Sequence, residues 1–237
     1  MSHHQDFTIQ ALSENALVLY FGNLIREDII NRISNLNYSL KTAPFDGFIE
    51  SVPAYVSLTV YYDPEAVLKS DQLKGDYAFE KVQNYLSDLH LAPLPQTTRK
   101  ELLIPVCYGD EYGPDLADVA KHAGVTEEEV IKQHSNADYL VYMLGFMPGF
   151  PYLGGLPDAL SMPRKNVPRA VVPAGSVGIA GKQTGIYPLN SPGGWQIIGR
   201  TPVILFDAAQ SEPAVFLPGS RVKFSPITRA DFKMLTN

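Results

Sequence analysis

Cysteine is almost absent from this sequence, and several other features of secreted, membrane and metal-binding proteins are missing as well. Cys107 is the single cysteine in 237 residues, which excludes an internal disulfide framework and a thiolate metal cluster. No run of about 18 apolar residues occurs, and the N-terminal residues lack the basic and apolar regions of a secretory signal. The five histidines show no HExxH or similar ligand spacing. We expect a cytoplasmic protein, not embedded in a membrane, with no metal site.

Basic residues are in the minority, with 19 Lys and Arg against 25 Asp and Glu and a net charge of -6. This balance argues against nucleic acid or an anionic membrane as the main partner. The segment 161–200 differs, because it contains no Asp or Glu. Its basic residues are Arg164, Lys165, Arg169, Lys182 and Arg200. The sequence therefore predicts one locally cationic segment in an acidic protein.

The first hundred residues alternate between strand and helix patterns. Residues rich in β-formers predict strands over 15–22, 47–52, 55–62 and 100–107. Apolar residues at helical spacing predict helices over 24–40 and 76–91. The resulting order, βαββαβ, is that of a ferredoxin-like unit.

The second half has a different texture. Two short helices are predicted over 115–123 and 127–134, the second opened by Thr126 with Glu129 in a capping box. About half of the chain's 18 glycines and 19 prolines lie between residues 145 and 200, which disfavours regular helices there. Short strands packed as a β-barrel fit this pattern best. We expect an α+β protein with a ferredoxin-like domain over residues 1–97 and a β-barrel domain over 98–237.

The sequence does not match the common nucleotide-binding motifs, and its cysteine does not fit a nucleophile. GSVGIAGKQ (175–183) superficially suggests a P-loop, but its spacing is one residue too long and Gln183 stands where Ser or Thr is required. The same glycines do not follow the dinucleotide pattern. Cys107 lies in an apolar run, so a buried inert thiol is favoured over a nucleophile. His134, taken alone, fits a structural histidine at the end of a helix.

Three segments carry the candidate chemistry. GFMPGFPYLGG (145–155) holds Phe146 and Phe150 apart with prolines and glycines that stiffen the chain, although an ordinary core-covering loop is the alternative. In MPRKNVPRAVVPAGSVG (162–178) prolines flank basic residues that suit a carboxylate or phosphate, with a solvated basic face as the alternative. The last segment, 181–202, carries groups that suit an amide-bearing small molecule: Gln183, Tyr187, Ser191, Trp195, Gln196 and Arg200.

In order and spacing, these three segments closely resemble the family of B-type 5-oxoprolinase subunits (PxpB), also called KipI or allophanate hydrolase subunit 1. VCYGDEYGPDL (106–116) and the segment around Glu129 and His134 also look like that family. The resemblance covers roughly residues 100–220 well and the N-terminal half more weakly. It implies a ferredoxin-like domain followed by a cyclophilin-like β-barrel, in agreement with the textures above.

The resemblance further implies a hydrolase active only in complex, which cleaves the lactam of 5-oxoproline to glutamate with ATP. A PxpC-like subunit would be the direct partner and a PxpA-like subunit the functional one. We expect no cofactor bound by this chain, with ATP bound elsewhere in the complex. The catalytic candidates are His134, Arg164, Arg169 and Gln183, and the substrate-binding candidates are Phe146, Phe150, Tyr187, Ser191, Trp195 and Arg200.

Two relatives of the family offer other functions. One is a carboxyltransferase-like subunit of a urea carboxylase and allophanate hydrolase system, although Lys233 does not lie in the AMKM-like hairpin that a fused biotin carrier needs. The other is a KipI-type inhibitor, a binding module that docks on a sensor histidine kinase.

Overall fold

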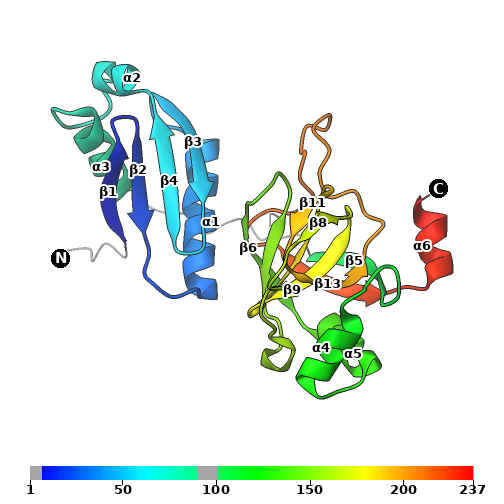
Figure 1. Cartoon of the computed structure of the whole chain (residues 1–237). Helices are drawn as coiled ribbons and strands as arrows, with labels where there is room; N and C mark the ends of the chain where they lie inside the picture. The colour runs from blue at the N-terminus through cyan, green and yellow to red at the C-terminus, as the bar shows by residue number, and fades with distance from the viewer. Residues whose placement is uncertain (1–6, 90–100, 237) are drawn as a thin grey trace. The chain divides into compact units, whose positions relative to one another are not determined.

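The structure is a computed structural model that describes residues 7–89 and 101–236. The chain divides into two compact units, Met1–Thr98 and Arg99–Asn237, and each is described by itself. The predicted boundary between residues 97 and 98 lies outside the described residues. Both units mix strands and helices, so the expected α+β class is confirmed (Figure 1).

The first unit is an antiparallel sheet in the order β1-β2-β4-β3, packed against helices. Apolar residues at helical spacing bury one face of α1, from Ile29 through Ile33 and Leu36 to Leu40, against the sheet. Helix α3 adds Val82 and Leu86 to the same core. The elements are β1 (Thr8–Ser13), β2 (Ala16–Tyr20), α1 (Glu27–Thr42), β3 (Phe48–Pro53), β4 (Ser57–Tyr62), α2 (Pro64–Lys69) and α3 (Ala78–Asp88).

One strand pairing predicted from the sequence is wrong. The strand predicted over 100–107 exists as β5 (Glu101–Tyr108), but it pairs in parallel with β13 (Arg221–Pro226) in the second unit and not with the N-terminal sheet. Strand β1, which was not predicted, forms a hairpin with β2. It occupies the edge of the sheet beside β2, where the ferredoxin-like order would place the strand over 100–107. Strand patterns report local conformation, whereas partner choice depends on residues far along the chain.

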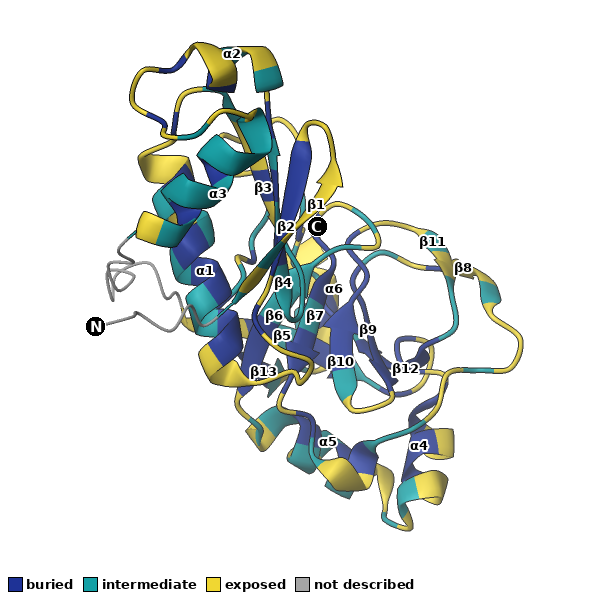
Figure 2. Ribbon diagram, turned by 90° about the vertical axis from the view of Figure 1, so that its left-hand side faces the viewer, coloured by how far each residue is buried: buried dark blue, intermediate teal, exposed yellow. Residues whose placement is uncertain are grey.

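The second unit is a closed barrel in the order β10-β7-β6-β13-β5-β12-β9, as the barrel prediction requires. Apolar side chains from every strand fill its interior, and strand β9 is buried throughout (Figure 2). The strands not yet bounded are β6 (Tyr139–Leu144), β7 (Pro151–Gly154), β9 (Ser176–Ala180), β10 (Gln183–Ile186) and β12 (Gln196–Arg200).

Both helices predicted before the glycine-rich segment are confirmed, as α4 (Leu116–Ala123) and α5 (Glu127–Asn136), and they contact β12 and β13. The Thr126 hydroxyl accepts a hydrogen bond from the Glu129 N–H, which is half of the predicted capping box. Among described residues, the glycine-rich segment contains the 3-10 turn η2 (Asp158–Leu160) and no longer helix. The final helix is α6 (Arg229–Thr236).

A separate two-stranded sheet is not hydrogen-bonded into the closed barrel. Strand β8 (Arg169–Val172) pairs with β11 (Ser191–Gly193), so that Arg169 lies opposite Gly193. This pairing brings the second and third candidate segments of the sequence together.

Candidate functional site

A cavity of about 230 Å³ lies where the three candidate segments meet. Aromatic side chains dominate it, and the chain around the β8–β11 sheet supplies proline and glycine. Among the described residues that line it, Arg164 is the single charged side chain. The lining residues are Phe146, Phe150, Tyr152, Arg164, Pro168, Tyr187, Pro192, Gly193, Gly194 and Trp195.

The inner wall of the cavity is a cluster of buried aromatic rings. The ring of Phe150 stands edge-on to those of Tyr187 and Trp195, with centroids 5.2 Å and 5.4 Å away. All three residues are at most 5% exposed. Gly185 lies against this cluster, and a Cβ there would approach both Phe150 and Trp195 within about 3.0 Å. The glycine therefore allows the rings to pack onto strand β10.

The outer edge of the cavity is formed by Phe146, which is 62% exposed and has a backbone φ of 67°. A positive φ is strained for an aromatic residue, and such strain clusters at functional sites. The ring still stands edge-on to Phe150, with centroids 5.6 Å apart. This large exposed ring beside a cavity suits contact with a ligand.

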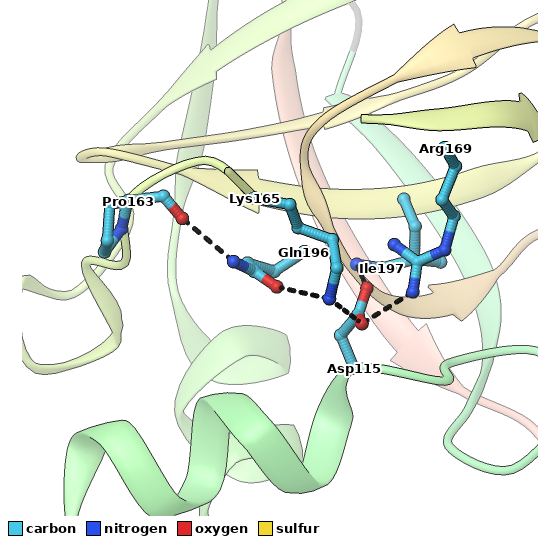
Figure 3. Close-up of polar contacts among 6 residues, drawn as sticks. All are labelled: Asp115, Pro163, Lys165, Arg169, Gln196 and Ile197. Atoms are coloured by element: carbon cyan, nitrogen blue, oxygen red, sulfur yellow. Dashed lines mark hydrogen bonds and ion pairs between the residues drawn. The ribbon is translucent and has the colours of Figure 1, made fainter. Parts of the chain in front are cut away.

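The basic residues near the cavity divide into paired and unpaired side chains. The Lys165 ammonium donates to the carboxylate of Asp115 at 2.7 Å, and the Arg169 guanidinium donates to the same oxygen at 2.6 Å (Figure 3). Arg164 makes no ion pair within residues 7–89 and 101–236. One cation therefore faces the cavity without a protein counter-ion.

Asp115, which pairs with two of the basic candidates, is a residue that sequence reasoning did not single out. Its side chain is 2% exposed and also accepts the backbone N–H of Ile197 at 2.7 Å. Burial raises the pKa of this carboxyl, but hydrogen bonds from Arg169, Lys165 and Ile197 outweigh burial and hold the pKa below its ordinary value. The sequence offered one indication of this residue: Asp115 directly precedes helix α4 and lies within 106–116, a segment that carries part of the family resemblance.

Two tyrosines of the cavity keep their protons. Burial raises the pKa of Tyr187 and Tyr152, while the positive charge of Arg164 acts in the opposite direction on both phenols. The backbone N–H of Trp195 donates to the Tyr187 hydroxyl. Arg164 is thus close enough to both rings to influence their ionisation.

His134 lies on helix α5 with its side chain fully buried, and it is not among the cavity-lining residues. Its Nδ1 is 2.8 Å from the Tyr108 hydroxyl, and its Nε2 is 3.0 Å from the hydroxyl of Thr184, which in turn donates to the Gly178 carbonyl. This series of hydrogen bonds fits a neutral His134 ring that donates from Nε2 and accepts at Nδ1. Burial lowers the pKa of His134 to about 3, so the ring stays neutral at physiological pH.

The remaining predicted site residues are not among the cavity-lining residues either. Gln183 begins strand β10 opposite Ala180, and Arg200 donates from Nε to the carbonyl of Ala174 at 2.7 Å. Ser191 begins strand β11, and its buried hydroxyl oxygen has no hydrogen-bond partner in the described part of the chain. The structure therefore brings together Phe146, Phe150, Arg164, Tyr187 and Trp195 from the original set.

Three other features that could indicate a function are a reactive thiol, a metal site and a membrane-spanning helix. Cys107 is 3% exposed, and burial raises the pKa of its thiol, as the prediction of an inert thiol implies. Residues 7–89 and 101–236 contain no group of three or more His, Cys, Asp or Glu side chains placed to hold a metal ion. Over the same residues, no helix is both long and apolar enough to cross a membrane.

The chain is thus a two-unit α+β protein with a closed barrel. Its aromatic cavity, with Arg164 in the lining, suits a small molecule that carries a negative charge. Residues 7–216 match the family described as carboxyltransferase domain, subdomain C and D. The chain is 43% identical to the B-type 5-oxoprolinase subunit of Bacillus subtilis over 228 residues, which cover 95% of each chain. The chain belongs to the family of B-type 5-oxoprolinase subunits, which confirms the resemblance found in its motifs.

Two further comparisons place the chain beside longer proteins. The crystal structure of TTHA0988 is similar with a TM-score of 0.78 and 37% identity, over 90% of this chain and 40% of that longer chain. The urea amidolyase of Saccharomyces cerevisiae is 29% identical over 96% of this chain and 14% of its own length. Both units therefore have counterparts within larger proteins.

Proposed function

We propose that this chain is the PxpB component of an ATP-dependent 5-oxoprolinase, which cleaves 5-oxo-L-proline to L-glutamate in the cytoplasm. The observation that carries the proposal is the 43% identity to the Bacillus subtilis protein over 95% of both chains. A PxpC-like subunit is the direct partner and a PxpA-like subunit the functional one. The chain acts as a hydrolase component only within that complex.

The proposal assigns ATP to a partner subunit. Phosphorylation of the lactam oxygen converts an unreactive amide into a good electrophile that water then opens. This chain carries neither a P-loop nor a dinucleotide motif. Its contribution is to hold the activated lactam and to stabilise the negative charge that develops as the ring opens.

Individual roles follow from the chemistry of the side chains. The position of Arg164 in the cavity supports a role in binding a carboxylate or phosphate. Arg169 and Arg200 stay predicted for the same task, although Asp115 already pairs with the first. Gln183 is predicted to bind the lactam, and His134 is predicted to move a proton. Single substitutions of each residue, assayed for glutamate release, test these roles.

The test is ATP-dependent glutamate release from 5-oxoproline by purified PxpA-like and PxpC-like partners, with and without this chain. Activity that requires the chain supports the assignment. Absence of glutamate from a complex shown to be assembled overturns it. The isolated chain is then assayed under the same conditions, and it is expected to release no glutamate.

Two observations favour a second function: the match to a carboxyltransferase domain and the distant likeness to a urea amidolyase. In that function the cavity holds the reactants while the carboxyl group of carboxybiotin passes to an amide nitrogen of urea, and the proton of that nitrogen passes to biotin. Incubation with a carboxylated biotin carrier and urea tests this. Carboxylated product that forms only with this chain would move the assignment to carboxyl transfer.

A further inference from the structure

The segment that carries Arg164 is fastened to the barrel on both sides of that residue. On one side, the Pro163 carbonyl accepts from the Gln196 amide at 2.9 Å. On the other side, the Lys165 backbone N–H donates to the Gly194 carbonyl at 2.7 Å. Two consecutive anchors leave the backbone of Arg164 little freedom.

The side chain of Lys165 adds a third anchor through Asp115, whose carboxylate accepts from it at 2.7 Å (Figure 3). The same carboxylate binds Arg169 and the Ile197 N–H, so it joins helix α4, strand β12 and the Arg164 segment at one point. A 2% exposed carboxylate holds such partners firmly because water does not compete for them.

Asp115 also decides which cation is available to a ligand. It neutralises Lys165 and Arg169, the basic neighbours of Arg164 in the sequence. The cavity is left with the guanidinium of Arg164, beside the rings of Tyr152 and Phe146. A guanidinium at the edge of an aromatic cavity binds a carboxylate bidentately while the apolar part of the ligand packs on the rings.

We propose that this cavity is a carboxylate-recognition subsite in which Arg164 binds the anion and Asp115 is the positioning residue that holds Arg164 in place. The inference rests on the proposed function for its ligand, a small lactam bearing one carboxylate. The volume of about 230 Å³ suits a ligand of that size.

The test compares two ligands on the full-length chain by NMR titration. One is 5-oxo-L-proline, and the other is 2-pyrrolidinone, the same lactam ring without the carboxylate. Arg164→Gln weakens 5-oxo-L-proline binding by roughly 10- to 100-fold, the equivalent of one lost charged hydrogen-bonded pair. It leaves the 2-pyrrolidinone affinity unchanged. The matched control, Arg229→Gln, alters an exposed arginine of α6 and changes neither affinity.

The positioning role is tested by Asp115→Asn, with Asp118→Asn on the exposed side of the same helix as control. A positioning role predicts a selective loss of 5-oxo-L-proline affinity, whereas a general structural defect weakens both ligands equally. Because Asp115→Asn can prevent folding, Lys165→Met provides a milder variant that leaves the Asp115 bonds to Arg169 and Ile197 in place. In the assembled complex both variants raise KM for 5-oxo-L-proline more than they lower kcat.

The outcomes separate this inference from the proposed function. An active complex in which Arg164→Gln keeps the native affinity and KM overturns the subsite and leaves the function standing. An inactive complex whose isolated chain still binds 5-oxo-L-proline through Arg164 overturns the function alone. No binding of either ligand to the full-length chain overturns the subsite, and an equal loss of both affinities in Asp115→Asn and Lys165→Met overturns the positioning role.

Discussion

The guanidinium of Arg169 donates to the carboxylate of Asp115 at 2.6 Å, although the two residues are 54 positions apart in the chain. Lys165 binds the same oxygen, so one buried acid serves two cations. The segment 161–200 lacks acidic residues, and its counter-ion comes from the start of helix α4. This arrangement links Lys165 and Arg169 to the start of helix α4.

Replacement of Asp115 with alanine is expected to lower the free energy of unfolding by about 3–5 kcal/mol, because it leaves Lys165 and Arg169 partly buried without a counter-ion. Asp118→Ala, at an exposed position of the same helix, is expected to stay within about 0.5 kcal/mol of the native value. Urea unfolding followed by circular dichroism measures both. Equal stabilities for the two variants would contradict a structural role for the ion pairs.

The stability of the protein is expected to fall in acid because of His134. Its pKa is lowered from 6.5 to about 3 by burial, so between these values the unfolded chain binds a proton that the folded chain does not. The stability that the neutral ring contributes is complete above about pH 6.5 and is lost progressively toward pH 3, by at most about 5 kcal/mol. Urea unfolding at a series of pH values measures the slope.

The matched variants for this prediction are His134→Gln and His122→Gln. His134→Gln removes the buried titrating ring and flattens the slope between pH 6.5 and 3, although it lowers stability at neutral pH. His122 is exposed on helix α4, and His122→Gln controls for the replacement of a histidine as such; the slope of His134→Gln is compared with the slope of this variant. An unchanged slope in His134→Gln would show that other groups dominate the acid response.

Substitution of Gly185 by alanine is expected to disturb the aromatic wall. The added methyl would lie 2.9 Å from both Phe150 and the Pro151 carbonyl and 3.0 Å from Trp195, so these groups must move. We expect a loss of about 1–3 kcal/mol in stability and, in the proposed complex, a raised KM for 5-oxoproline. At Gly194, which also lines the cavity, the same methyl meets its nearest neighbours at 3.7 Å. Gly194→Ala should therefore keep native stability in thermal denaturation.

Phe146 should matter for ligand binding more than for folding. Its ring is 62% exposed and its φ of 67° is strained, so Phe146→Gly relieves strain while it removes a cavity edge. We expect a change in unfolding free energy of less than about 1 kcal/mol, together with a several-fold rise in KM. Ile204→Ala, at a 76% exposed position outside the cavity lining, is the control and should leave KM unchanged. A native KM in Phe146→Gly would remove this residue from the site.

Much of the local structure could be predicted because it depends on nearest neighbours. Helices α4 and α5, the Thr126 cap and the β-rich character of residues 145–200 follow from spacing, capping and glycine content. The strand predicted over 100–107 is found as β5 (Glu101–Tyr108), but its partner was not predicted. Pairing with β13 joins residues about 120 positions apart, and no local pattern encodes such a choice.

Patterns along the chain were enough to predict the α+β class, the barrel, the family and the aromatic and basic groups from which the site is built. The folded arrangement settled which of those groups act together. It placed Arg164 beside the aromatic rings, paired Arg169 with Asp115 and buried His134 between helix α5 and its neighbours. The physical reason is that ion pairing and burial depend on distances in space, which the folded backbone sets between residues far apart in the chain.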